Sequence, residues 1–188
     1  MIKLFRTSAA VAVTLAAFSF LAATEVSAQR GRGGPLMMVT SDAFPDGGVV
    51  PDKYVSRGDN VQPGFKFTDI PANGVSLAII FHDIDVAFGG TGDVLHWMAW
   101  NVPLAGGEIP EGSLPAGSVQ GNNIRQQPGY MGPGAPVGER YHHYVFEFYV
   151  LSENIDLPAS ASREDLLAAI ADKVVGKAAY VGRYRGTE

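Results

Sequence analysis

The sequence predicts a mainly β protein with one helix near its C-terminus. Its 23 glycines and 12 prolines fall between short apolar runs rather than in one block. Those runs are rich in β-branched and aromatic residues, which favour strands. Only one segment has the period of an amphipathic helix. Turn residues spaced between strand-like runs indicate many short strands rather than disorder.

Three apolar runs are the strongest strand candidates. Residues 75–81 (VSLAIIF) form a continuous apolar run, as expected for a strand buried on both faces. Residues 95–102 form a second run, in which His96 is a polar exception, and residues 144–151 form a third that is rich in aromatic side chains. Weaker strand candidates are residues 36–40, 64–68 and 178–184.

The helical period lies between these last strand candidates. Leu166, Ile170 and Val174 repeat every four residues. Ser162 is a suitable N-cap, and Gly176 suits the end of a helix because glycine adopts the left-handed conformation common there. We therefore expect a helix that begins after Ser162 and ends near Gly176.

The first 28 residues resemble a cleavable secretory signal. Residues 1–6 are basic, residues 9–23 are almost entirely apolar, and residues 26–28 (VSA) form a small-x-small cleavage pattern. The apolar run of about 15 residues is short for a membrane span, which needs about 20. We expect cleavage after Ala28 and export to the periplasm or the medium; an uncleaved anchor is the alternative.

The remaining chain is predicted to be one domain, residues 36–188, after a flexible leader at residues 29–35. Its length is sufficient for a single hydrophobic core. The net charge of the full sequence is −5 and no basic patch is present, which argues against nucleic acid as a partner. The chain contains no cysteine, which excludes disulfides, thiol chemistry and a lipid-modified cysteine.

Polar side chains gather at the end of the first apolar run. Strand alternation places Asp83 and Asp85 on one face and His82 and Ile84 on the other. Two neighbouring carboxylates are costly to bury without a cationic or hydrogen-bonding partner. For Asp85 alone a role as a turn residue is favoured. Asp83 lies closer to the strand body and is equally well explained as a structural residue or as a site residue.

A second group follows a loop rich in glycine and proline, GYMGPGAPVGERYHHY. Alternation places His142 and Tyr144 on one face and His143 on the other, so we expect His143 to face solvent. Loop glycines such as Gly132 and Gly134 allow backbone N–H groups to approach a ligand and to form an anion-binding concavity.

Several kinds of chemistry can be compared with these residues. His96, His142 and Asp83 could hold a metal, but no short-spaced ligand pair is present. The sequence has no GxSxG and no phosphate-loop fingerprint. A pocket for a small anion requires only imidazoles, loop N–H donors and an aromatic wall, and it fits best. No cofactor is predicted.

The order of these motifs resembles the phosphatidylethanolamine-binding protein family, and most closely its bacterial Raf kinase inhibitor-like branch. The resemblance rests on HDIDVA, on HW followed by WNVP, and on GYMGPGAPVG followed by HHYVFEFYVL. It covers essentially the whole chain after the predicted signal.

The resemblance implies a β-sandwich-like fold with a large antiparallel sheet, a smaller sheet and peripheral helices. It also implies a pocket for phosphate, acetate-like anions or a phospholipid headgroup, in which Asp83 fixes a histidine tautomer. The ligand-binding residues that it implies are Asp83, Asp85, His96, Gly132, Pro133, Gly134, His142 and Tyr144.

The sequence departs from the family pattern at several positions. Ile84 and Ala87 stand where the family has two prolines, and Ala135 replaces a proline of the loop. His143 replaces an arginine. The lost prolines reduce the rigidity of the pocket rim rather than its donors, and the change at His143 is expected to weaken an outer salt bridge or hydrogen bond. The ligand preference is therefore left open.

Three functions are consistent with the sequence. The first is an exported, non-catalytic protein that binds a small anion or a phospholipid headgroup. The second is a protein-interaction module that inhibits a protease or another envelope enzyme through the pocket rim. The third is an enzyme with His96 or His142 as general base, although no nucleophile is apparent.

Overall fold

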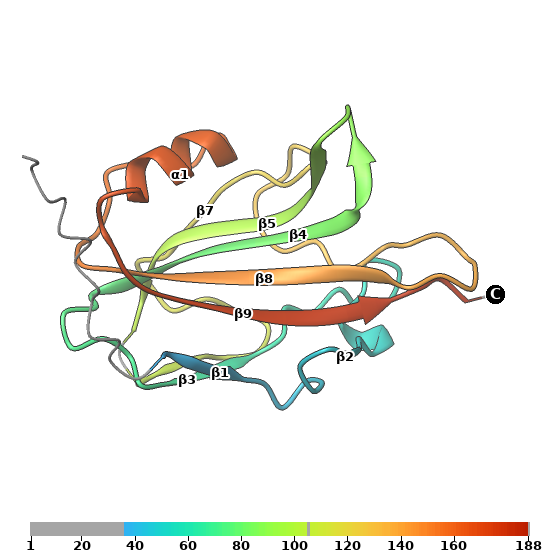
Figure 1. Ribbon diagram of the computed structural model, residues 1–188, viewed down its shortest axis with the longest axis horizontal. Helices are drawn as coiled ribbons and strands as arrows, with labels where there is room; N and C mark the ends of the chain where they lie inside the picture. Colours follow the sequence, from blue (N-terminus) through green and yellow to red (C-terminus); the bar gives the residue numbers. More distant parts are fainter. Residues whose placement is uncertain (1–35, 105, 188) are drawn as a thin grey trace, which may run out of the picture. The chain divides into compact units, whose positions relative to one another are not determined.

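The computed structural model describes residues 36–104 and 106–187, which fold into two β-sheets and one α-helix (Figure 1). The mainly β class, the pair of sheets and the helix near the C-terminus confirm the fold predicted from the sequence. The predicted signal segment and leader, residues 1–35, lie outside the described residues.

The larger sheet has the strand order β2-β9-β8-β4-β5-β7. Its neighbouring strands are antiparallel, except that β2 pairs with β9 in parallel. In this order the strands are β2 Gly48–Val49, β9 Val174–Tyr184, β8 His142–Leu151, β4 Ser76–Phe88, β5 Gly92–Pro103 and β7 Val119–Gln120.

The smaller sheet has the order β1-β3-β6 and is antiparallel. Its strands are β1 Met38–Thr40, β3 Phe65–Thr68 and β6 Glu108–Ile109. A short 3-10 helix, Asp52–Tyr54, lies between β2 and β3 in the sequence. The weak strand candidates at residues 36–40 and 64–68 thus correspond to β1 and β3.

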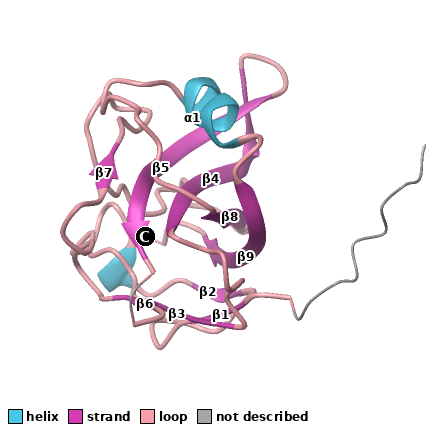
Figure 2. Ribbon diagram, turned by 90° about the vertical axis from the view of Figure 1, so that its left-hand side faces the viewer, coloured by secondary structure: helices cyan, strands magenta, loops and turns pink. Residues whose placement is uncertain are grey.

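The larger sheet is covered on both faces: the smaller sheet lies on one face and α1, Arg163–Ile170, lies on the other (Figures 1 and 2). The continuous apolar run in β4 follows from this arrangement. Leu77, Ile79 and Phe81 pack with Phe65 and Phe67 of the smaller sheet. The alternate residues of β4 pack with α1 and its flanking segments, and the strand therefore needs apolar side chains on both faces.

The helix begins as predicted but ends earlier. Ser162 is the N-cap, and its side chain forms a capping box with Asp165. Val174 is already the first residue of β9, and Gly176 lies within that strand, so the predicted helix end is wrong. Packing explains the glycine instead, because a Cβ at Gly176 would lie 2.8 Å from Cγ of Pro71.

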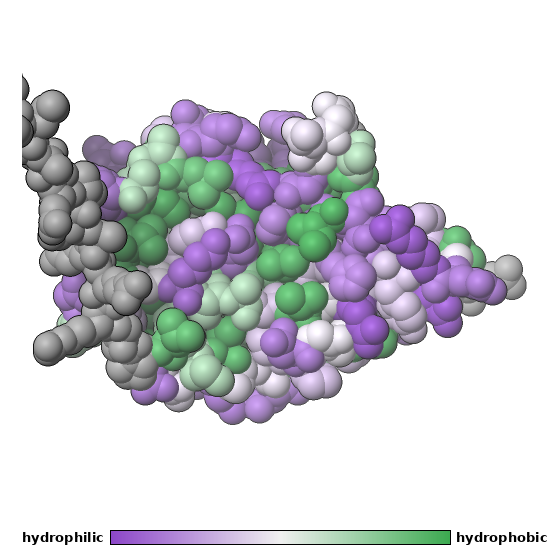
Figure 3. Space-filling model, in the orientation of Figure 1, coloured by the Kyte–Doolittle hydropathy of each residue, from purple (hydrophilic) through white to green (hydrophobic). Residues whose placement is uncertain are grey.

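Hydrophobic residues on the surface are distributed in separate groups. Figure 3 shows such groups among hydrophilic residues on the side of the molecule where β8 and β9 run in Figure 1. On β8, strand alternation explains the mixture. Glu147 and Tyr149 point away from the aromatic core that Phe146 and Phe148 enter.

Candidate functional site

A cavity of about 230 Å³ lies where the ends of β4, β5 and β8 meet the loop before β8. Four of the predicted site residues, Asp83, His96, His142 and Tyr144, line it together. The other lining residues are Ser56, Val86, Val94, Ile124, Arg125, Met131, Gly134, Ala135 and Pro136. Side chains from positions 83 and 142 therefore meet although 59 residues separate them.

A β-bulge directs His96 toward this cavity. Phe81 pairs with Trp97 and His82 pairs with Leu95, so His96 is the extra residue on β5. Regular alternation would place His96 and Trp97 on opposite faces. The bulge instead allows both side chains to point toward the smaller sheet, where His96 packs against Phe81 and Tyr144. Bulges commonly redirect a side chain next to a functional site.

The ring of His96 is held by the loop before β8. Its Nδ1 lies 2.9 Å from the carbonyl oxygen of Met131 and 3.1 Å from that of Gly132. The residue is only 4% exposed, and burial lowers the pKa of His96 below its ordinary value. The imidazole is therefore neutral at pH 7.

Asp83 and His142 form a pair on adjacent strands. Nδ1 of His142 lies 2.8 Å from Oδ2 of Asp83, whose other oxygen accepts the backbone N–H of Asp85 at 3.0 Å. Asp83 is 3% exposed, so these bonds compensate for the loss of water around its carboxylate. The pair agrees with the expectation that Asp83 orients a histidine of the site.

Tyr144 forms the aromatic wall. Its ring meets that of His96 edge to face, with the centroids 5.2 Å apart. Its hydroxyl oxygen accepts the backbone N–H of Gly134 at 3.3 Å. Burial and the nearby carboxylate of Asp83 raise the pKa of Tyr144 above its ordinary value, so the phenol keeps its proton.

The loop residues have different roles from one another. Of Gly132, Pro133 and Gly134, only Gly134 lines the cavity. The N–H of Gly132 donates to Oδ1 of Asn60 at 2.8 Å, and the carbonyl of Pro133 accepts the N–H of Ser56 at 2.9 Å. Gly132 and Pro133 thus lie behind the site and hold the loop in place, and the N–H of Gly132 is already engaged.

Asp85 does not line the cavity. Its carboxylate lies 2.5 Å from the guanidinium of Arg140 and 2.8 Å from Nδ1 of His143. Although burial opposes it, hydrogen bonds from His143 and Arg140 hold the pKa of Asp85 below its ordinary value. The side chain of His143 is 47% exposed, in line with its predicted position on the outer face.

Sequence reasoning missed several residues of the site. Ser56 and Asn60 come from the segment after the 3-10 helix, which no motif connects with the histidines. Arg125 supplies a cation at the cavity and comes from the segment just before the glycine loop. The only available signal was its proximity to GYMGPG in the sequence.

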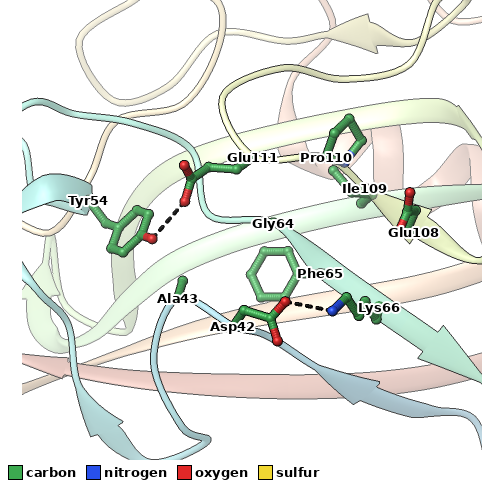
Figure 4. Close-up of a pocket in the computed structure, with 10 residues that line it drawn as sticks. All are labelled: Asp42, Ala43, Tyr54, Gly64, Phe65, Lys66, Glu108, Ile109, Pro110 and Glu111. Atoms are coloured by element: carbon green, nitrogen blue, oxygen red, sulfur yellow. Dashed lines mark hydrogen bonds and ion pairs between the residues drawn. The ribbon is translucent and has the colours of Figure 1, made fainter.

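A second cavity, of about 340 Å³, lies at the smaller sheet (Figure 4). It contains the carboxylates of Asp42, Glu108 and Glu111. Lys66 pairs with Asp42, and Tyr54 donates to Glu111 at 2.7 Å. An acidic lining disfavours anions. The cavity of His96 and His142 is therefore the better candidate for the anion site.

Among residues 36–104 and 106–187, no three histidine, cysteine or acidic side chains lie close enough together to hold a metal ion. Within the same ranges, no helix has the length and hydrophobicity required to cross a bilayer.

Known proteins share this sequence and fold. A family model described as "Phosphatidylethanolamine-binding protein" matches residues 40–185. A UPF0098 protein of Pyrococcus abyssi is 36% identical over 161 residues, which cover 82% of this chain and 88% of the relative. A Mycobacterium tuberculosis protein named as a candidate lipoprotein, LppC, is 33% identical over 150 residues, covering 80% of this chain and 73% of that protein.

Solved structures agree. The crystal structure of a candidate phosphatidylethanolamine-binding protein homologue from Chlamydia trachomatis superposes with a TM-score of 0.73 and 29% identity, covering 80% of this chain and 98% of its own. The crystal structure of Escherichia coli YbcL superposes with a TM-score of 0.74 and 24% identity, covering 80% of this chain and 99% of its own. This similarity supports the fold. From the family match and these relatives, we conclude that the chain belongs to the phosphatidylethanolamine-binding protein family.

Proposed function

We propose that this protein is an exported, non-catalytic binding protein whose cavity takes a small anion, with phosphate and phosphate-bearing headgroups as the main candidates. The observation that carries the proposal is the convergence of Asp83, His96, His142 and Tyr144 on one cavity beside Arg125. Arg125 brings positive charge to the cavity, and the Nδ1 contact with Asp83 holds the ring of His142 in place beside it.

The lining argues against catalysis. Ser56 is the only serine, threonine or cysteine among the residues that line this cavity. Its hydroxyl donates to the carbonyl of Pro133 at 3.0 Å rather than to a histidine. A serine nucleophile requires a general base within hydrogen-bond reach, and Ser56 has none in this arrangement.

Export rests on the predicted signal sequence at residues 1–28, and we propose a periplasmic or secreted location on that basis. The description of the mycobacterial relative as a candidate lipoprotein is compatible with an envelope location. Lipid attachment to cysteine is not carried over, because this sequence contains no cysteine.

Isothermal titration calorimetry tests the binding proposal. We expect inorganic phosphate and phosphoethanolamine to bind the wild type, and His142→Ala to weaken binding by at least about tenfold, as expected for the loss of a charge-assisted hydrogen bond. His143→Ala is the matched control, because its ring points outward, and it should bind as the wild type does. No heat with the wild type, or unchanged affinity in His142→Ala, would refute the proposal.

A second candidate function is a protein-interaction module that inhibits a protease or another envelope enzyme. The observation that favours it is the exposure of two apolar side chains near the cavity, with Ile124 at 37% and Val137 at 52%. A stoichiometric partner from envelope extract that is lost in Val137→Asp, together with absence of anion binding, would support this function over the first.

A further inference from the structure

Part of the larger sheet is open on the side where α1 lies. The helix and its flanking segments cover β4, β5 and the Leu151 end of β8. In Figure 1 no described element crosses in front of the middle of β8 and β9, and Figure 3 shows this surface. Three rows of cross-strand partners point outward here. We call these six residues the open strip: His143 with Arg183, Val145 with Val181, and Glu147 with Ala179.

The centre of the open strip is apolar. Val145 and Val181 lie directly opposite each other, each is half-buried, and neither belongs to the two core clusters of the domain. Val49 of the edge strand β2 flanks the strip beside Arg183 and is 48% exposed. An antiparallel sheet face that remains in water is normally polar. The valine row is therefore typical of a face that packs against another layer.

A cation lies two residues from the valine row in one direction. The guanidinium of Arg183 lies 5.5 Å from the ring centroid of Tyr141. Its Nε is buried, and within residues 36–104 and 106–187 it has no hydrogen-bond partner. A buried N–H without an acceptor is costly, so Arg183 is suited to a carboxylate from outside the chain.

A carboxylate lies two residues from the valine row in the other direction. Oε1 of Glu147 pairs with Nζ of Lys177 at 2.7 Å. Oε2 lies 3.6 Å from Nε2 of His82, which is too far for a hydrogen bond. Glu147 therefore retains an oxygen that can accept from another donor. The cation and the carboxylate lie at equal spacing on either side of the apolar centre.

This spacing makes the open strip complementary to itself. A two-fold axis that runs across the strands above Val145 and Val181 places the valine row against the same row of a second copy. Arg183 then lies over Ala179 of the partner subunit, whose short side chain leaves room for the guanidinium to reach Glu147 of the partner subunit. An axis along the strands would instead place Arg183 against His143 of the partner subunit and give Glu147 no cation.

We propose that the open strip is the interface of a symmetric dimer, with the valine row on the two-fold axis and Arg183 paired with Glu147 of the partner subunit. The interface is separate from the cavity, because Asp83 and Tyr144 point to the opposite face of the sheet. It goes beyond the proposed anion binding and does not depend on it. Since the strip is only two strands wide, we expect a weak dimer whose population rises with concentration.

Sedimentation equilibrium of the purified protein, from the low micromolar to the submillimolar range, tests the dimer. The average mass of the wild type should rise toward twice the monomer mass. Val181→Lys should raise the dissociation constant by at least about a hundredfold, because it brings two ammonium groups together at the axis. Met38→Lys is the control: Met38 is 55% exposed on the smaller sheet, and this variant should dimerise as the wild type does.

Exchanging the two charges tests the predicted pairing. Arg183→Glu should weaken the dimer by at least about tenfold, because it faces Glu147 of the partner subunit. Adding Glu147→Lys to this variant should restore the dissociation constant to within about threefold of the wild type. A double variant that folds and remains as weak as Arg183→Glu alone would overturn the pairing and the inference with it.

Crosslinking provides an arm that does not require a change at Glu147. Because the chain contains no cysteine, a single introduced cysteine can react only with its counterpart in a second copy. Val181→Cys lies on the axis, and disulfides do form between stacked sheets, so mild oxidation should produce a covalent dimer. Met38→Cys should remain monomeric although its position is more exposed.

Two results would overturn the inference. One is a wild type that stays monomeric at every concentration, whether or not a different protein binds to the open strip. The other is a dimer that survives Val181→Lys, or that fails to crosslink in Val181→Cys, because such a dimer would use another face. A concentration-dependent dimer that is lost in Val181→Lys and captured in Val181→Cys would support it.

Discussion

Gly132→Ala is the most direct test of how the loop holds the site. A Cβ at this position would lie 2.1 Å from the carbonyl oxygen of Tyr54 and 2.8 Å from the backbone nitrogen of Ser56. Cβ contacts under 3.0 Å essentially do not occur, so the backbone must separate by about 0.9 Å. Neither partner can rotate away, because both atoms belong to the main chain.

The cost follows from the bonds that this movement disturbs. The N–H of Gly132 bonds to Asn60, and its carbonyl lies against Nδ1 of His96. Overpacking of this kind costs about 1–3 kcal/mol, and for a domain of this size about 2–4 °C in melting temperature is lost per kcal/mol. We expect a decrease of about 2–12 °C, together with weaker phosphate binding because the acceptors of His96 shift.

Thermal unfolding followed by circular dichroism measures the first effect, and calorimetry measures the second. Gly138→Ala is the matched control in the same loop, because no atom lies within 4 Å of the Cβ position and the residue does not have a left-handed φ. It should melt as the wild type does or slightly higher. If Gly132→Ala and Gly138→Ala melt within 1 °C of each other, the steric reasoning is wrong.

Two further predictions concern stability. Phe65 lies at the centre of the aromatic core, with its ring centroid 4.9 Å from those of Phe146 and Phe148, so Phe65→Ala should lower the free energy of unfolding by about 3–5 kcal/mol in urea denaturation. Met38→Ala, at a residue 55% exposed, should change it by less than about 0.5 kcal/mol; similar losses in the two variants would contradict the assignment of the core. At the opposite face of the larger sheet, burial opposes ionisation of Asp93, but hydrogen bonds from Arg163 and His82 hold its pKa below the ordinary value of 3.8. The contribution of Asp93 to the free energy of unfolding is therefore complete above pH 3.8 and is lost as the pH falls through the lower folded pKa. Asp93→Asn should flatten the acid side of a plot of unfolding free energy against pH. An unchanged plot would count against this role.

The sequence predicted the architecture well because burial on both faces leaves a clear pattern. The run from Val75 to Phe81 is apolar without alternation, since the smaller sheet covers one face of β4 and α1 covers the other. The helix start was also readable, because Ser162 and Asp165 form the capping box locally. The end of the helix could not be read from the sequence, because Gly176 is required by packing against Pro71 rather than by a helix terminus.

The candidate site was only partly predictable. Alternation correctly separated His142 from His143, since β8 is regular at that end. It could not assign His96, whose direction depends on the bulge between the Phe81 and His82 pairs. Ser56 and Asn60 could not be connected with the site either, because their bonds to the loop join segments more than 70 residues apart.

Regular alternation along β4 explains why two of its neighbouring residues serve different environments, and the bulge on β5 adds His96 to one of them. Before the bulge, Phe81 continues the apolar row that faces the smaller sheet. Beyond it, Asp83 holds that same face and meets His142, while His82 turns to the other face and lies 2.5 Å from Asp93. The extra residue on β5 allows His96 to join Asp83 without moving His82 out of its own pair. One inserted residue on β5 therefore brings the imidazole of His96 to the cavity, beside the ring of Tyr144.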